Sequence, residues 1–182
     1  VGFDIAPAGF GSYAGQVFSL AQPKVAMPGA VSNHVVQLIE PERDFAARIF
    51  CTLPEAGAKK ISGFGLDARF GLNDSPFANK LFVVTIYNDA IYQVNAAGEC
   101  TPFVVFDGQR YSAPATIAFT PDGQRMLVSV SVGVFDIMSL DPTRGAIVEV
   151  SADGTIAAQP IFEGPGKPMG MAYAPAGFGD YG

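Results

Sequence analysis

The stretch Ala6-Pro-Ala-Gly-Phe-Gly-Ser-Tyr-Ala-Gly15 decides the fold, because most of it returns as Ala174-Pro-Ala-Gly-Phe-Gly-Asp-Tyr-Gly182. The two copies begin 168 residues apart, which is much longer than one supersecondary unit. The chain is therefore expected to contain an internal repeat, with weaker copies between these two.

Four short segments share an apolar pattern at a nearly constant spacing. They are GFDIAP from Gly2, GFGLDA from Gly63, TIAFTP from Thr116 and GMAYAP from Gly170, about 56 residues apart on average. In this alignment, Asp4 stands where the other copies have Gly65, Ala118 and Ala172. Small residues at these positions indicate that the segments are inner strands, which converge and leave little room for side chains.

Each repeat continues with three further apolar runs, separated by Asp-Gly, Asn-Asp and Ala-Gly turns. The runs are rich in Val, Ile, Phe and Tyr, which is typical of strands joined by hairpins. They cover residues 16–20, 33–39 and 46–53, then 80–86, 90–94 and 101–106, then 125–130, 146–150 and 156–162. No amphipathic helical stretch competes with them. Four antiparallel strands in a unit of this size are typical of a propeller blade, so the sequence predicts an all-β chain that forms a β-propeller.

The predicted organisation is a single propeller domain with about three blades and one inner strand. The blades span about 2–62, 63–115 and 116–169, and the first strand of a fourth blade spans about 170–182. Three blades alone leave blade faces and strand edges bare. We therefore expect the chain to be part of a longer, six-bladed ring, and the alternative is a homodimer in which two three-blade chains close one ring.

Composition excludes several classes of protein. A chain with 49% hydrophobic residues and 15 Phe is too apolar for disorder, and a formal charge of −6 leaves no basic stripe for nucleic acid. No apolar run reaches the roughly 18 residues of a spanning helix, so no membrane insertion is expected. The compartment stays unassigned, with an extracellular or periplasmic location favoured. Cys51 and Cys100 could form a bridge or remain two thiols.

The phrases GMAYAPAGFGDYG (170–182) and TIAFTPDGQRMLVSV (116–130) resemble the six-bladed β-propeller superfamily that includes the gluconolactonase/senescence-marker, NHL-repeat and TolB-like families. In the lactonase-like members, Glu, Asn and Asp side chains near the axis hold one divalent cation, usually calcium. The resemblance therefore implies calcium as a cofactor and makes Asp4 the candidate metal ligand. The alternative for Asp4 is a carboxylate held by backbone N–H groups or channel water.

A second group of candidates consists of cationic and aromatic residues in the predicted connections between blades. They are Lys59, Lys60, Arg110, Tyr111 and Lys167. Connections of this kind emerge around the channel mouth of a propeller, where ligands usually bind. We therefore interpret these residues as a site for an anionic or sugar-like ligand. The alternative is that they form a solvated rim of the propeller and bind no ligand.

The remaining polar candidates have structural interpretations. His34, the single His, is expected to be a surface or hydrogen-bonded structural residue at the edge of the ring. Asn88-Asp89, Asp122-Gly123 and Asp153-Gly154 are expected to be turns, since these residues tolerate positive φ.

Two functions from different classes follow. The first is a propeller that binds a small-molecule or protein ligand at the channel mouth. The alternative is a calcium-dependent, lactonase-like hydrolase with its metal on the axis. The chain has no HExxH, GxSxG or GxxxxGK[ST] motif, so classical hydrolase and nucleotide sites are unsupported and the question of enzyme activity stays open.

Overall fold

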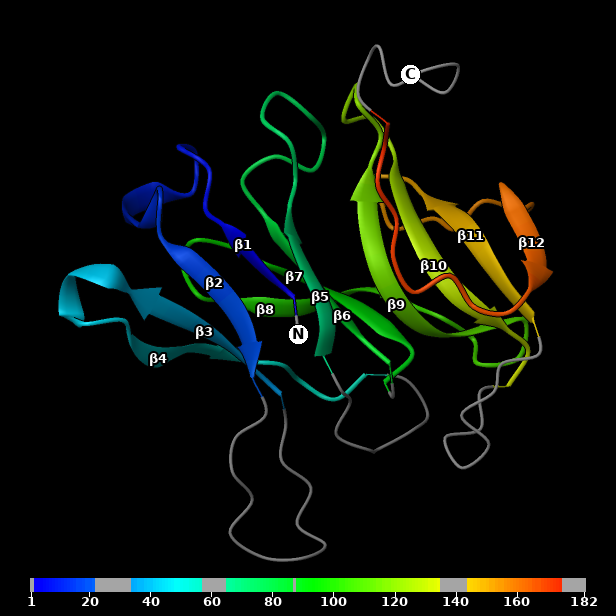
Figure 1. Ribbon diagram of the computed structural model, residues 1–182, viewed down its shortest axis with the longest axis horizontal. Helices are drawn as coiled ribbons and strands as arrows, with labels where there is room; N and C mark the ends of the chain where they lie inside the picture. The colour runs from blue at the N-terminus through cyan, green and yellow to red at the C-terminus, as the bar shows by residue number, and fades with distance from the viewer. Residues whose placement is uncertain (1, 22–33, 57–64, 87, 135–143, 175–182) are drawn as a thin grey trace, which may run out of the picture.

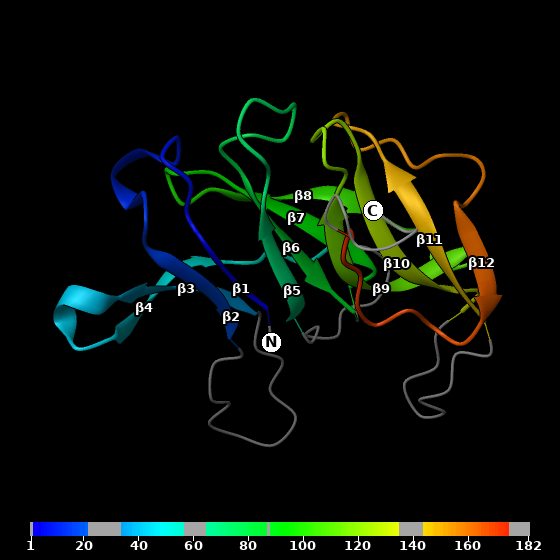
Figure 2. The same ribbon diagram turned by 45° about the horizontal axis from the view of Figure 1, so that its top comes forward.

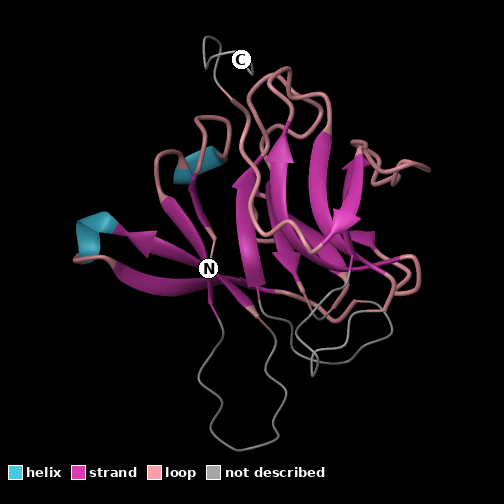
Figure 3. Ribbon diagram, turned by 45° about the vertical axis from the view of Figure 1, so that its right-hand side comes forward, coloured by secondary structure: helices cyan, strands magenta, loops and turns pink. Residues whose placement is uncertain are grey.

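The computed structural model describes residues 2–21, 34–56, 65–86, 88–134 and 144–174. These residues form three four-stranded antiparallel sheets and two single-turn 3-10 helices, Gly11–Tyr13 and Pro41–Arg43 (Figures 1 and 3). Within the described ranges, neither helix has the length or the apolar character needed to cross a bilayer.

Each sheet is a meander in which strands consecutive along the chain pair with each other. Sheet 1 contains β1 (Phe3–Ile5), β2 (Val17–Ala21), β3 (Val35–Glu40) and β4 (Ala46–Thr52). Sheet 2 contains β5 (Gly65–Phe70), β6 (Leu81–Thr85), β7 (Ala90–Val94) and β8 (Cys100–Val105). Sheet 3 contains β9 (Tyr111–Phe119), β10 (Met126–Val132), β11 (Arg144–Val150) and β12 (Phe162–Pro165). The prediction of an all-β chain with four antiparallel strands in each repeat is confirmed.

Sheet 3 departs from the predicted strand bounds. Its first strand begins at Tyr111 and not at Thr116, so Tyr111 belongs to β9 and not to a connection. Its last strand covers Phe162–Pro165 and not 156–162, and Ile156 forms only an isolated bridge to Val150. Pro160 lies in the expected strand and has no N–H to donate to a ladder, which accounts for the break. Residues 170–174, expected as the first strand of a fourth blade, belong to no strand.

The first strands of the three sheets lie side by side, β5 against β1 on one side and against β9 on the other. Figures 1 and 2 show these strands in the middle of the molecule, with β4 and β12 at opposite sides. The backbone at Gly2, just before β1, approaches β5 closely: a Cβ added at Gly2 would lie 2.5 Å from Cα of Asp67. The crowding predicted for the inner strands therefore holds at Gly2.

Sheet 2 lies between the other two sheets, and this explains why every residue of β6 is buried. Leu81 and Val83 belong to the apolar core shared with sheet 1. Phe82 and Val84 point to the opposite face and belong to the core shared with sheet 3. Alternate residues of one strand thus hold two cores together, as the two-residue period of a strand requires.

The two cores repeat one aromatic arrangement. Phe10, from the β1–β2 turn, packs with its ring centroid 5.4 Å from that of Phe18 and 4.8 Å from that of Phe70, at the end of the next inner strand. Phe77, from the β5–β6 turn, lies in the same way 5.6 Å from Phe82 and 5.2 Å from Phe119. A Phe from each turn therefore closes one end of the space between neighbouring sheets.

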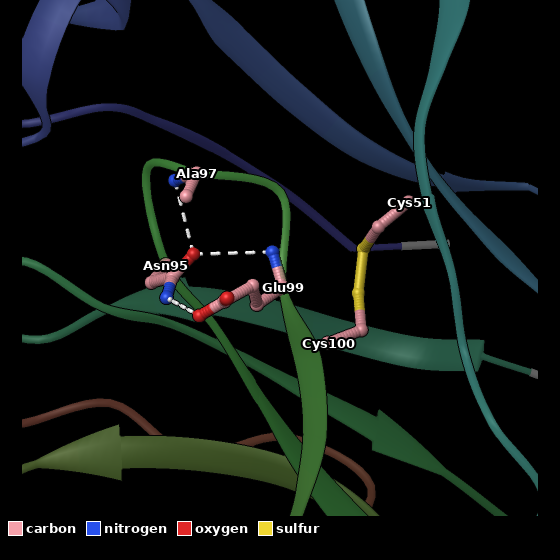
Figure 4. Close-up of a disulfide and its surroundings, with 5 residues drawn as sticks. All are labelled: Cys51, Asn95, Ala97, Glu99 and Cys100. Carbon is pink, nitrogen blue, oxygen red and sulfur yellow. Dashed lines mark hydrogen bonds between the residues drawn. A yellow bond between two sulfur atoms is a disulfide. The ribbon is translucent and has the colours of Figure 1, made fainter.

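A disulfide joins Cys51 of β4 to Cys100 of β8 (Figure 4), with 6.3 Å between the Cα atoms. The structure therefore places the two cysteines together, a question that the sequence left open. The Asn95–Glu99 turn lies just before Cys100, and in it Oδ1 of Asn95 accepts hydrogen bonds from the backbone N–H groups of Ala97 and Glu99. The bridge links the outer strands of sheets 1 and 2, opposite the contact between their inner strands.

We expect the double substitution Cys51→Ser, Cys100→Ser to lower the free energy of unfolding by about 3–4 kcal/mol, because the bridge closes a long loop in the unfolded chain. Urea unfolding of the variant and the wild-type protein measures this difference. Thiol titration of the unfolded, unreduced wild-type protein is the control, and it should find no reactive thiol. Two reactive thiols, or equal stabilities, would contradict the expectation.

Candidate functional site

The connection from sheet 2 to sheet 3 is shaped by the carboxylate of Asp107. Its Oδ1 accepts hydrogen bonds from the backbone N–H groups of Gln109 at 2.9 Å, Arg110 at 2.8 Å and Tyr111 at 3.3 Å. The bonds from Gln109 and Arg110 are the main reason that the pKa of Asp107 lies below its ordinary value. The ionised carboxylate thus fixes the backbone that presents Arg110 and Tyr111.

The guanidinium of Arg110 is held at two places. Its Nη2 donates to the carbonyl oxygen of Ala158 at 2.6 Å, in the interrupted last part of sheet 3. Its Cζ lies 4.9 Å from the centroid of the Tyr111 ring, a cation–π contact. Arg110 therefore spans from the connection between the sheets to the segment that follows β11.

A hollow of about 220 Å³ lies beside these contacts, and we call it the Arg110 hollow. It is lined by Val105, Phe106, Asp107, Arg110, Tyr111, Ile156, Ala157 and Ala158. Tyr111 is 5% exposed, and its hydroxyl has no hydrogen-bond partner among the described residues. The hydroxyl oxygen has almost no accessible surface, so a molecule in the hollow does not reach it. The sequence predicted Arg110 and Tyr111 together, and the structure brings them together.

Lys167 occupies a different place from the Arg110 hollow. Its ammonium donates a hydrogen bond to the carbonyl of Ala113, and the N–H of Ala113 donates to Oδ1 of Asp89 at 2.6 Å. Burial lowers the pKa of Lys167 to about 8, and the nearby Asp89 carboxylate opposes that shift. Ala113 has a φ of +47°, a left-handed conformation that is strained for a non-glycine residue. Lys167 and Asp89 thus hold a strained point of β9 from two sides.

Asp89 is a turn residue, as expected, but it also has a second role in the contact between two sheets. It has a φ of +48°, as a turn requires, but it is 5% exposed and its carboxylate bonds to the neighbouring sheet. Asp122 and Asp153 do behave as turn residues. The hydroxyls of Thr120 and Ser151 donate to them and are the main cause of their lowered pKa values.

Of three other candidate residues, the structure describes His34 but not Lys59 and Lys60. Lys59 and Lys60 lie outside the described residues, so their part in a site stays a prediction. His34 precedes β3 and is 5% exposed, so it is a buried and not a surface residue, and burial lowers its pKa.

The carboxylate of Asp4 is held by backbone N–H groups, which was the alternative to metal binding. Its Oδ1 accepts from the N–H of Ile5 and its Oδ2 from the N–H of Phe70 on β5, both at 2.8 Å. In the described part of the chain, no three His, Cys, Asp or Glu side chains gather as a metal site would need. Calcium binding at Asp4 stays a prediction.

Asp67 is the inner-strand carboxylate that sequence reasoning missed. It is 5% exposed, and its Oδ2 accepts from the hydroxyl of Thr116 at 2.8 Å and from the N–H of Ile117 at 3.0 Å, both on β9. Arg69 pairs with it at 3.2 Å. Asp67 therefore joins β5 to β9 as Asp4 joins β1 to β5. The phrases Gly-Phe-Asp at 2–4 and Gly-Leu-Asp at 65–67 were the signal that could have found it.

Comparisons with known proteins give a structural likeness only. No protein-family model matches the chain, and no curated protein sequence matches it significantly. Among solved structures, it is similar to the crystal structure of a functionally unknown protein from Desulfotomaculum acetoxidans DSM 771, with 16% sequence identity and a TM-score of 0.44. The match covers 86% of this chain and 40% of that protein, so the chain spans less than half of that protein's length.

We expect Asp67→Ala to lower the free energy of unfolding by about 3 kcal/mol or more, because it leaves buried donors of β9 without an acceptor. Asp67→Asn keeps one acceptor oxygen and should cost less. Asp4→Ala is the matched comparison, since its carboxylate is less buried and accepts fewer bonds. Urea unfolding measures all three, and a loss below about 1 kcal/mol for Asp67→Ala would contradict the structural role.

The lowered pKa of Lys167 predicts a pH dependence of stability. The folded protein binds this proton less tightly than the unfolded chain does, so the buried ammonium destabilises the fold below about pH 8. This cost is relieved as the pH rises from about 8 toward 10.5, the ordinary value. Relative to Lys167→Met, the free energy of unfolding of the wild-type protein should therefore rise over this range by at most about 3 kcal/mol. Urea unfolding at pH 7, 8, 9 and 10 tests this, and parallel curves would contradict it.

Proposed function

We propose that this chain is a ligand-binding β-propeller and that its binding site is the Arg110 hollow. Three features support the propeller arrangement: each sheet is a four-stranded meander, the first strands β1, β5 and β9 lie side by side, and the sheets pack face to face through two apolar cores. In this proposal the three sheets are consecutive blades, and their first strands line the axis.

The observation that carries the binding proposal is the guanidinium of Arg110, which lines the hollow and is held in place by Ala158 and by the Tyr111 ring. A guanidinium has five N–H donors, and one of those of Arg110 donates to the carbonyl oxygen of Ala158. A ligand with hydrogen-bond acceptors can use the remaining donors at a low cost in conformational entropy, because the guanidinium is already oriented. The hollow lies between the end of the outer strand β8, the sheet 2–sheet 3 connection and the segment after β11.

The groups around the hollow suit binding better than bond cleavage. Oδ1 of Asp107 is occupied by three backbone N–H groups, and Arg110 is held by Ala158 and by the Tyr111 ring. Most of the remaining lining is apolar, from Val105, Phe106 and Ile156. Apolar walls with a few fixed polar groups are typical of small-molecule sites. The calcium-dependent hydrolase remains a prediction that no contact in the described residues favours.

Ligand-observed NMR with a library of small polar and amphiphilic molecules tests the proposal. Ala157→Phe should abolish binding, because Ala157 lines the hollow and a phenyl ring would fill much of it. Ala97→Phe is the control, since Ala97 is exposed in the β7–β8 turn at the opposite end of β8. Thermal unfolding checks that both variants fold. The proposal fails if no molecule binds, or if Ala157→Phe and Ala97→Phe bind the same molecules equally well.

A further inference from the structure

We propose that Asp89 and Lys167, which do not line the Arg110 hollow, are positioning residues of that hollow. They hold Ala113 in the conformation that places the guanidinium of Arg110 beside Ala158. The inference rests on the proposed function, because it assigns the residues that orient the guanidinium of that site. It is carried by a bulge in β9 and by the contacts that two other segments of the chain make with this bulge.

The bulge covers residues 113–115 of β9, which stand opposite a single residue of β10. Its middle residue, Pro114, has no N–H to donate to the ladder, and Ala113 has its φ of +47°. The two extra residues of the bulge set the register of everything before them in β9. Without them, the start of β9 would shift along β10 by two residues, which is about 7 Å. Such a shift would break the hydrogen bond between Arg110 and Ala158.

Asp89, in the β6–β7 turn, contacts the chain on both sides of Arg110. Its carbonyl oxygen accepts from the N–H of Phe106 at 2.8 Å, before Arg110, and its Oδ1 accepts from the N–H of Ala113 at 2.6 Å, after it. Between these two points, a Cβ added at Gly108 would lie 3.4 Å from Oδ2 of Asp89. The connection that presents Arg110 therefore runs around one carboxylate of sheet 2.

Lys167 holds Ala113 from the other side. It follows β12, and its ammonium donates a hydrogen bond to the carbonyl oxygen of Ala113. The N–H and the C=O of Ala113 are thus both bonded to charged side chains, one from sheet 2 and one from the segment after β12. A left-handed conformation is unfavourable for alanine and persists only where the surrounding structure fixes it. Asp89 and Lys167 are the groups that fix it here.

Asp107 contributes to the site in a different way. The three N–H groups that bond to it lie in its own connection, so they set the shape of that turn and would move with it. Asp89 and Lys167 join the turn to other parts of the sheets, so they decide where it lies. The N–H of Gly133, just after β10, donates to the carbonyl of Arg110 at 2.9 Å, and this contact also depends on the bulged register.

Relaxation of the ¹⁵N nucleus in the Nε–H group of Arg110 tests the proposal without any ligand. We expect an order parameter of about 0.85 in the wild-type protein, and below about 0.6 in Asp89→Ala and in Lys167→Met. Adding Ala113→Gly to either variant should restore part of the order, because Gly adopts the left-handed conformation without steric cost. Asp122→Ala is the matched control, since Asp122 is also a turn carboxylate with hydroxyl and backbone donors, but lies at the other end of β9. It should leave Arg110 rigid.

Thermal unfolding identifies the variants that fold. If Asp89→Ala does not fold, Lys167→Met carries the test, with the same expected loss of order and the same rescue. A rigid Arg110 in the folded variants would overturn the proposal. A loss of order that Ala113→Gly does not reduce would overturn it as well, because the effect would then not act through the conformation of Ala113.

The library of small molecules connects this inference to the proposed function. Molecules that bind the wild-type protein and are excluded by Ala157→Phe should bind Asp89→Ala or Lys167→Met about five-fold or more weakly, and Asp122→Ala equally well. Unchanged affinity beside a mobile Arg110 would overturn the positioning role. If no molecule binds the wild-type protein, the proposed function fails, and the relaxation measurement still decides whether Asp89 and Lys167 hold Arg110 in place.

Discussion

The buried carboxylate of Asp67 is the constraint on which the relation between the sheets depends. A buried carboxylate is tolerated only when hydrogen bonds and charge compensate its desolvation, and here the donors come from two different sheets: Ala68 and Arg69 on β5, and Thr116 and Ile117 on β9. A shift of β9 along β5 by one residue would remove both donors of β9. The carboxylate therefore selects one stagger between sheets 2 and 3, and Asp4 with Phe70 does the same for sheets 1 and 2.

Apolar packing supplies most of the cohesion around these polar contacts. Sheet 2 contributes a face to each core, and each core is closed at one end by a Phe from a turn, Phe10 in one and Phe77 in the other. At the opposite end of the sheets, sheets 2 and 3 also make polar contacts: Asp89 and Lys167 hold the strained backbone of Ala113 from opposite sides. Sheets 2 and 3 thus pack through an apolar core, and the charged side chains of Asp89 and Lys167 fix the backbone near the connections.

The sheet to which each strand belongs could be predicted from the sequence because that information is local. Apolar runs, turn residues and a period of about 56 residues define three groups of four strands without any knowledge of how the sheets meet. Contacts between sheets are not local. The role of Asp67 was missed because the alignment set Gly65 opposite Asp4, a slip of two residues that keeps the apolar alternation and hides the shared Gly-x-Asp phrase. The pairing of Cys51 with Cys100 could not be predicted either, since it depends on how two outer strands approach.

The places where the repeat is broken are also the places where the candidate site forms. The last strand of sheet 3 is interrupted near Pro160, and the carbonyl of Ala158 accepts from Arg110. The first strand of the same sheet begins early, which buries Tyr111 between sheets 2 and 3 and leaves its hydroxyl without a described partner. Departures from local rules are expected at functional or strained sites. The Arg110 hollow is such a departure, with its polar groups already held in place by Asp107 and Ala158.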